Sequence, residues 1–302
     1  MNLEEEERDG YIVPRQIKQV WSVQMKLLVK LLEVCKKHHL SIWASSGTLL
    51  GAVRHKGYIP WDDDVDMVMM RDDYQKLIEV APREFASPYF FQCAYTESVP
   101  YHRGHAQLRM NDTAAILPHD VNRNFHQGIF IDIFVFDALP DDESLYASYV
   151  EELDEAQRHV MSAYTKFKLG LNPFGNLRML KSWIYAHTHD YLKTFRAYEV
   201  LLSKYKISEN RYVVKSGLIH NLQYIKDKRI DKSCYDETIY LPFEDIEMPV
   251  PKGYDVVLST LYGDYMSPVK QPTYHGGFLV LDPERSYQPY LNELRKKGKS
   301  GR

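Results

Sequence analysis

Four aspartates, Asp62, Asp63, Asp64 and Asp66, lie within five residues at the start of an apolar segment. From Asp64 onward, acidic and apolar residues alternate, which is the period of two expected of a β-strand. Asp64 and Asp66 would then share one strand face, with Cα atoms about 6.5–7 Å apart. Two carboxylates at this spacing can bind divalent cations together, and they repel each other without one. The pattern predicts a metal site, with a solvated acidic turn as the alternative.

The sequence excludes a calcium-binding EF-hand loop at this position. Asp62, Asp64, Asp66 and Asp73 have the EF-hand spacing of positions one, three, five and twelve. The motif needs glycine at position six for its sharp turn, and this chain has Met67 there, followed by further apolar residues. The aspartates are therefore expected to begin a buried element.

A third carboxylate, Asp132, interrupts the otherwise apolar run at residues 128–136. An isolated carboxylate in such a strand would cost on the order of several kcal/mol unless it is paired or bound to a metal. We therefore expect Asp132 to complete a cluster with Asp64 and Asp66. Magnesium, or else manganese, is the oxygen-seeking ion that such a cluster would hold against substrate phosphates. Pairing of Asp132 with a local arginine is the alternative.

The residues before the acidic segment are expected to bind phosphate. Small residues at 45–47 precede a short apolar helical pattern, so the free backbone N–H groups of a helix start would be available to an anion. Gly47 and Thr48 would cradle the phosphate, and Arg54 and Lys56 follow as cations that would bracket a diphosphate. An ordinary capped helix is the alternative.

The combined pattern resembles the nucleotidyltransferase superfamily, in which a small-Gly-Ser/Thr start precedes paired acids on one strand and a third acid on a later strand. The string from Gly47 to Asp66 is more specifically similar to the LicD family of phosphocholine transferases, to which the fukutin-related ribitol-phosphate transferases are also similar. Similar segments extend over roughly residues 14–140 and 240–280.

The resemblance implies an activity and further site residues. It implies metal-dependent transfer of a phospho-alcohol, with CDP-choline as the favoured donor, to a hydroxyl of a polysaccharide, teichoic acid or glycolipid precursor, with release of CMP. It implies donor contacts for Arg109, Asn111 and Thr113, with a polar strand end as the alternative. It brings the segment of His275 near the active site, where this residue would either meet a phosphate or be a surface histidine. Asp132 is the candidate base for the acceptor hydroxyl. Transfer of a nucleotidyl group, a CDP-ribitol or CDP-glycerol donor, and a non-catalytic carbohydrate-associated module stay open.

These side chains need a sheet to position them, and the sequence predicts an α/β or α+β fold with a nucleotidyltransferase-like mixed sheet flanked by helices. An amphipathic helix is expected to begin after Pro14, followed by helices at 48–55 and 72–85. The predicted strands lie at 40–44, 64–70, 90–94, 104–110, 114–117 and 129–134.

The predicted organisation has three parts. Residues 1–140 form the catalytic core, residues 141–210 form a largely helical insert that covers the sheet, and residues 211–302 complete the same domain and close the site. The final segment, 295–302, carries five cations. It is expected to be either a solvated tail or a contact to an anionic membrane surface.

Composition limits the classes of partner and the location expected for the protein. The 302 residues carry a formal net charge of −3, and the isoelectric point is near 6.5, so no basic field favours nucleic acid. The three cysteines lack the spacing of a zinc site or a disulfide framework. The N-terminus is acidic, unlike a signal peptide, and no run of about 18 apolar residues occurs. We therefore expect a cytoplasmic protein, free or at the inner face of the membrane.

Overall fold

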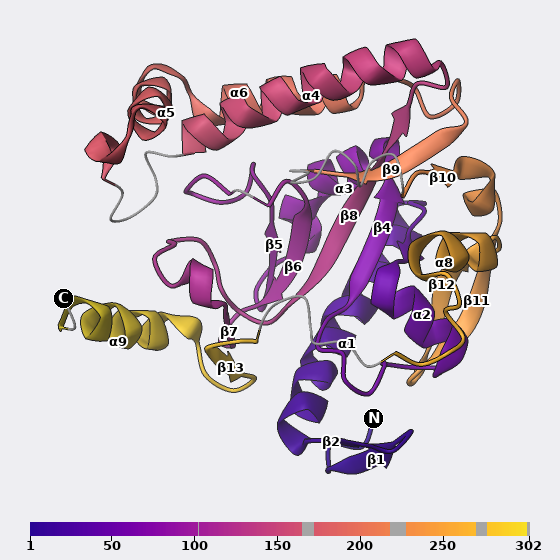
Figure 1. Cartoon of the computed structure of the whole chain (residues 1–302). Helices are drawn as coiled ribbons and strands as arrows, with labels where there is room; N and C mark the ends of the chain where they lie inside the picture. Colours follow the sequence, from indigo (N-terminus) through magenta and orange to yellow (C-terminus); the bar gives the residue numbers. More distant parts are fainter. Residues whose placement is uncertain (102, 165–171, 218–227, 270–276, 301–302) are drawn as a thin grey trace.

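The computed structural model describes residues 1–101, 103–164, 172–217, 228–269 and 277–300 (Figure 1). Its centre is a mixed sheet with the strand order β10-β9-β8-β4-β3, to which β6 and then β5 are added through β8. The strands are β3 (Trp43–Ala44), β4 (Asp66–Met70), β5 (Tyr89–Gln92), β6 (Ala106–Met110), β8 (Phe130–Leu139), β9 (Tyr212–Ser216) and β10 (Ile230–Asp231). The expected α/β class with a mixed sheet is confirmed.

The ten-residue strand β8 organises this sheet. On one edge β4 pairs with it in parallel, so that Asp66 lies beside Asp132. The other edge is shared, because β6 pairs with residues 130–133 and β9 pairs with residues 135–139, both antiparallel. A seam between the two neighbouring strands therefore lies next to Phe134.

Three helices surround the sheet. Helix α1 (Arg15–Lys37) contacts β6 and β8, and α3 (Arg71–Glu84) contacts β4 and β8. Helix α2 (Ser46–Arg54) follows β3 directly and contacts β4. The helix expected after Pro14 is present, and Pro14 is its N-cap residue. Its apolar stripe enters the main core through Val20, Trp21, Val23, Met25, Leu27, Leu28, Leu31, Val34 and Cys35.

The helical insert consists of α4 (Glu143–Tyr164), α5 (Leu177–Thr188) and α6 (Tyr191–Leu202), with a 3-10 turn, η3, at Pro173–Gly175. In Figure 1, α4 and α6 run across the upper end of the sheet and do not lie over its face. They form a separate apolar cluster that reaches Leu139 of β8 and Val214 of β9. The insert was expected to cover the sheet. It instead packs mainly on itself and caps the end of β8.

The C-terminal segment is part of the same fold. Beyond β9 and β10 it contains the 3-10 turn η4 (Lys232–Tyr235) and the antiparallel pair β11 (Thr238–Phe243) and β12 (Ile246–Pro251), which packs on α2 and β3. Helix α8 (Tyr254–Tyr262) has Gly263 as its C-cap residue, with a φ of 70°.

The periphery carries the remaining elements. Strands β1 (Glu6–Arg8) and β2 (Tyr11–Val13) pair near the N-terminus, β7 (Ala114–Ile116) pairs with β13 (Val280–Asp282), and η1 is a 3-10 turn at Pro118–Asp120. Helix α9 (Tyr287–Ser300) makes most of the basic tail helical, and Arg295 donates a 2.7 Å hydrogen bond to the carbonyl of Val121. Within the described ranges, no helix is both long and apolar enough to cross a membrane.

Candidate active site

The carboxylates of Asp64, Asp66 and Asp132 meet where β4 and β8 run side by side. Each offers one oxygen, and these oxygens all lie within 4.8 Å of one another. Asp62 and Asp63 form a second group of the same kind with Asp64. The structure therefore brings together the three acids selected from the sequence and adds the turn that precedes them.

Backbone hydrogen bonds hold two of these acids in place. The N–H of Asp132 donates to the carbonyl of Val65 over 2.8 Å. The N–H of Asp66 donates to the Thr48 hydroxyl oxygen, also over 2.8 Å. Thr48 is buried, so in this structure its hydroxyl positions β4 and is not open to a phosphate.

The acidic turn is held from two sides. From α1, the Trp21 indole N–H donates to the carbonyl of Asp62 over 3.1 Å, and the Gln24 amide donates to that of Asp63 over 2.8 Å. On the other side, a Cβ atom added to Gly47 would lie 2.5 Å from a carboxylate oxygen of Asp62. The acid therefore faces the start of α2, at the position where a phosphate was expected, and Gly47 provides the space for it.

Crowding changes the acidity of this group. Burial, and then the charges of neighbouring carboxylates, of which Asp66 is the first, raise the pKa of Asp62 to about 7. The same causes raise the pKa of Asp64 well above its usual range. A divalent cation would oppose both effects, and oxygen atoms are the ligands that magnesium prefers. The cluster therefore fits such an ion, held by Asp64, Asp66 and Asp132.

Asp132 is oriented by side chains of β6 and the residues before it. Nε2 of His105 lies 2.9 Å from one carboxylate oxygen of Asp132, and the Gln107 amide donates to the same oxygen over 2.6 Å. The Gln107 carbonyl in turn accepts hydrogen bonds from the Tyr101 hydroxyl, over 2.7 Å, and from the Arg109 guanidinium. These bonds fix which end of the Gln107 amide faces the acid.

The donor contacts expected of Arg109, Asn111 and Thr113 are not available in this structure. Arg109 is 1% exposed, and its guanidinium donates hydrogen bonds to groups of the protein itself. Thr113 is buried, and its hydroxyl donates to the carbonyl of Met110. Asn111 follows β6, about 13 Å along the strand from the residue that pairs with Asp132, at 3.3 Å per residue. The antiparallel course of β6 carries these residues away from the cluster.

Helix α2 also separates Gly47 and Thr48 from the cations that were expected to work with them. Arg54 ends this nine-residue helix, about 12 Å from its start at 1.5 Å per residue. Its guanidinium donates over 2.6 Å to the carbonyl of Tyr265, and Lys56 is exposed beyond the helix end. The two cations therefore do not bracket an anion at the start of α2. His275 lies outside the described residues.

Three side chains near the cluster were missed in the sequence: His105, Gln107 and Lys215. His105 directly precedes β6 and Gln107 lies on it, but their approach to Asp132 depends on a strand register that the sequence does not show. Lys215 follows two apolar residues of β9 and is a lone charge in a buried strand. A lone charge in an apolar strand was the reason for selecting Asp132, and the same criterion could have selected Lys215.

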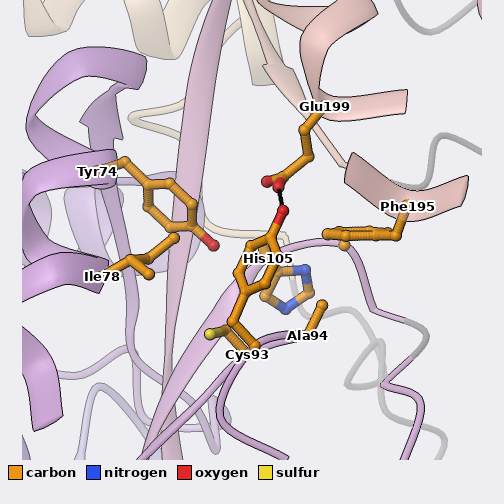
Figure 2. Close-up of a pocket in the computed structure, with 9 residues that line it drawn as sticks. Tyr74, Ile78, Cys93, Ala94, His105, Phe195 and Glu199 are labelled. Carbon is orange, nitrogen blue, oxygen red and sulfur yellow. Dashed lines mark hydrogen bonds between the residues drawn. The ribbon is translucent and has the colours of Figure 1, made fainter. Parts of the chain in front are cut away.

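His105 also lines a small cavity (Figure 2). Tyr74, Tyr95 and Phe195 line it, and the Tyr95 hydroxyl donates to the Glu199 carboxylate. Aromatic rings beside a carboxylate would suit a quaternary ammonium group. The free volume is about 10 Å³, room for roughly one water molecule. In this conformation the cavity is therefore too small for choline, and its lining residues have a structural role.

A mixed sheet with Asp66 and Asp132 on parallel neighbouring strands, and Asp64 in the turn before the first, is the arrangement expected of a nucleotidyltransferase-type domain. Residues 39–181 match the profile of the LicD/FKTN/FKRP nucleotidyltransferase domain. The chain is 26% identical over 264 residues, 85% of its own length and 89% of the relative's, to the lipopolysaccharide cholinephosphotransferase LicD of Haemophilus influenzae. It is also 30% identical over 152 residues, about half of each chain, to an uncharacterised protein of Rickettsia prowazekii. Residues 39–181 therefore contain a LicD-family domain, which confirms the resemblance seen in the sequence.

Proposed function

We propose that this protein transfers phosphocholine from an activated donor to a hydroxyl group of lipopolysaccharide or a related cell-surface glycan or glycolipid precursor. The Haemophilus influenzae relative is named for transfer of this group to lipopolysaccharide. The observation that carries the proposal is the meeting of Asp64, Asp66 and Asp132, from two strands and the turn before them, within 4.8 Å. Phosphoryl transfer needs such a cluster because charge must be neutralised on the transferring group.

The proposed donor is CDP-choline, and the proposed cofactor is magnesium, with manganese as a substitute. Bound by Asp64, Asp66 and Asp132, the metal would supply charge neutralisation for the phosphates. In the reaction, the bond between the transferred phosphorus and the CMP oxygen breaks, and a bond to the acceptor oxygen forms. The acceptor proton passes to a base, for which Asp132 is the candidate, and CMP leaves.

His105 and Gln107 would serve this proton transfer by orientation. Both bind the same oxygen of Asp132. A carboxylate whose rotation is restricted in this way presents its lone pair at a fixed position. The same geometry would serve transfer of a nucleotidyl group, so the reaction products must distinguish the two chemistries.

The test is a product analysis with purified protein, magnesium and lipopolysaccharide from cells that lack phosphocholine. CDP-choline is compared with CDP-ribitol, CDP-glycerol and CTP. We expect phosphocholine on the acceptor and an equal amount of CMP from CDP-choline alone. Excess chelator should abolish transfer, and magnesium or manganese should restore it where zinc does not, because the ligands are all oxygen. A nucleotide attached to the acceptor, with pyrophosphate released from CTP, would contradict the proposal.

A further inference from the structure

Lys215 is a cation on the same sheet face as the acid cluster. Strand side chains alternate between faces, so residues in register across the strands share a face. Asp66 is in register with Asp132, and Lys215 is in register with Phe136, four residues along β8 from Asp132. Because four is an even number, Asp132, Phe136 and Lys215 face the same side.

The side chain of Lys215 leans back toward the acids. Its ammonium lies 4.4 Å from the centre of the Phe134 ring, and it donates a 2.6 Å hydrogen bond to the Ser46 hydroxyl at the start of α2. Phe134 is one strand repeat, about 6.6 Å, from Asp132. The seam between β6 and β9 leaves the Phe134 ring open to two neighbours, Lys215 and His105.

Lys215 has no carboxylate partner among the described residues. Within the part of the chain that the structure describes, its ammonium contacts a hydroxyl and an aromatic ring and forms no ion pair with a carboxylate. Both Lys215 and Ser46 are half-buried, so the ammonium is partly removed from water yet still open to a ligand. A cation held in this way is better compensated when an anion binds beside it.

We propose that Lys215 binds a phosphate group that bridges it to the acid cluster. This inference deepens the proposed function and rests on it for the identity of the phosphate, as part of the diphosphate of the donor. Lys215 would hold this phosphate through a charge-assisted N–O contact of about 2.8 Å. Lys215 thus supplies the positive charge that Arg54 and Lys56 are too distant to give.

The test measures binding of inorganic pyrophosphate, with magnesium, by calorimetry, and so does not depend on which alcohol the donor carries. Lys215→Met keeps the aliphatic stem and removes the charge, and Lys215→Arg keeps the charge. We expect Lys215→Met to weaken binding by at least about tenfold, the lower end of the range for a charge-assisted hydrogen bond. Lys215→Arg should recover most of the affinity. Lys204→Met, an exposed change on the insert, is the matched control.

Turnover of CDP-choline is then measured on the same variants. Lys215→Met should raise the KM, and an unchanged melting temperature with Lys215→Arg rescue separates phosphate binding from a structural role. Equal pyrophosphate affinity in wild type and Lys215→Met, or no pyrophosphate binding by the wild type, would overturn the inference. Loss of pyrophosphate binding in Lys215→Met together with no CDP-choline turnover by the wild type would uphold it and overturn the donor assignment.

Discussion

At the scale of single residues, the acid cluster makes the metal-free protein less stable than its fold would otherwise allow. A carboxyl whose pKa is raised on folding binds more protons in the folded than in the unfolded state. The pKa of Asp62 rises from 3.8 to about 7, so its contribution to stability is present at low pH and is lost as the pH rises through that interval. We expect the free energy of unfolding of the metal-free protein to decrease across this range, as chemical denaturation at each pH would show.

Asp66→Asn separates the catalytic from the electrostatic role of this residue. It should cut turnover at least about a thousandfold, a loss of roughly 4 kcal/mol of transition-state stabilisation. Because it also removes a charge that repels Asp62 and Asp64, the metal-free variant should melt no lower than wild type, and magnesium should raise its melting temperature less. Asp236→Asn, an exposed change, is the control. Normal turnover in Asp66→Asn would contradict the metal cluster.

His105 and Gln107 are positioning residues for Asp132. His105→Ala and Gln107→Leu should each lower kcat about 10–100-fold, because loss of a supporting hydrogen bond lets the carboxylate rotate. The KM for the donor should change little, since neither side chain is placed on the phosphate path. The measurement is steady-state kinetics with a melting curve for each variant, and a large rise in KM at constant kcat would argue for direct donor binding instead.

At the scale of elements, α2 depends on a glycine in its middle. Alanine normally stabilises a helix interior relative to glycine, by about 1 kcal/mol. At Gly51, however, an added Cβ would lie 2.4 Å from the carbonyl oxygen of Gly57, which is backbone and cannot move aside. We therefore expect Gly51→Ala to destabilise the protein by about 1–3 kcal/mol, measured by denaturant unfolding. A stabilised variant would show that helix propensity outweighs the close approach.

The elements themselves could be predicted because their periodicity is strong. The predicted helix at 72–85 corresponds to α3 (Arg71–Glu84), and the predicted strand at 104–110 corresponds to β6 (Ala106–Met110). The strand predicted at 40–44 is only Trp43–Ala44, and the one predicted at 129–134 continues to Leu139. Apolar composition marks a buried segment, but the number of strand partners decides where a strand ends, and that number depends on the rest of the fold.

The active site could be predicted only in part, for a related reason. Asp64, Asp66 and Asp132 were recognisable because charges in apolar strands are costly. Arg54 was expected beside Gly47, but α2 places the two residues at opposite ends of a helix. The contacts of Arg109 with glutamines and a carbonyl could not be predicted without the strand register. Lys215 is 83 residues from Asp132 in sequence, so only the pairing of β9 with β8 brings it to the cluster.

At the scale of the whole molecule, a buried charge group joins the insert to the core. Arg71 of α3 donates to Asp137 of β8 over 2.7 Å and to Glu199 of α6 over 3.2 Å. Arg71→Met should lower the free energy of unfolding by about 3–5 kcal/mol, because it leaves the buried Asp137 and the half-buried Glu199 without their cationic partner. Arg83→Met, on an exposed position of the same helix, should be nearly neutral. Equal stability of the two variants, measured by denaturant unfolding, would exclude this link.

The divided edge of β8 has a consequence for how the chain can be cut. The segment that matches the family profile, 39–181, contains β8 and β6 but lacks β9, which pairs with residues 135–139, and also α1, which packs on β6 and β8. Expressed alone, this segment would expose an unpaired strand edge and an uncovered apolar face, and we expect it to aggregate. The segment that matches the family profile is thus shorter than the segment that must fold together. A chimera made from this chain and a relative would therefore have to include β9.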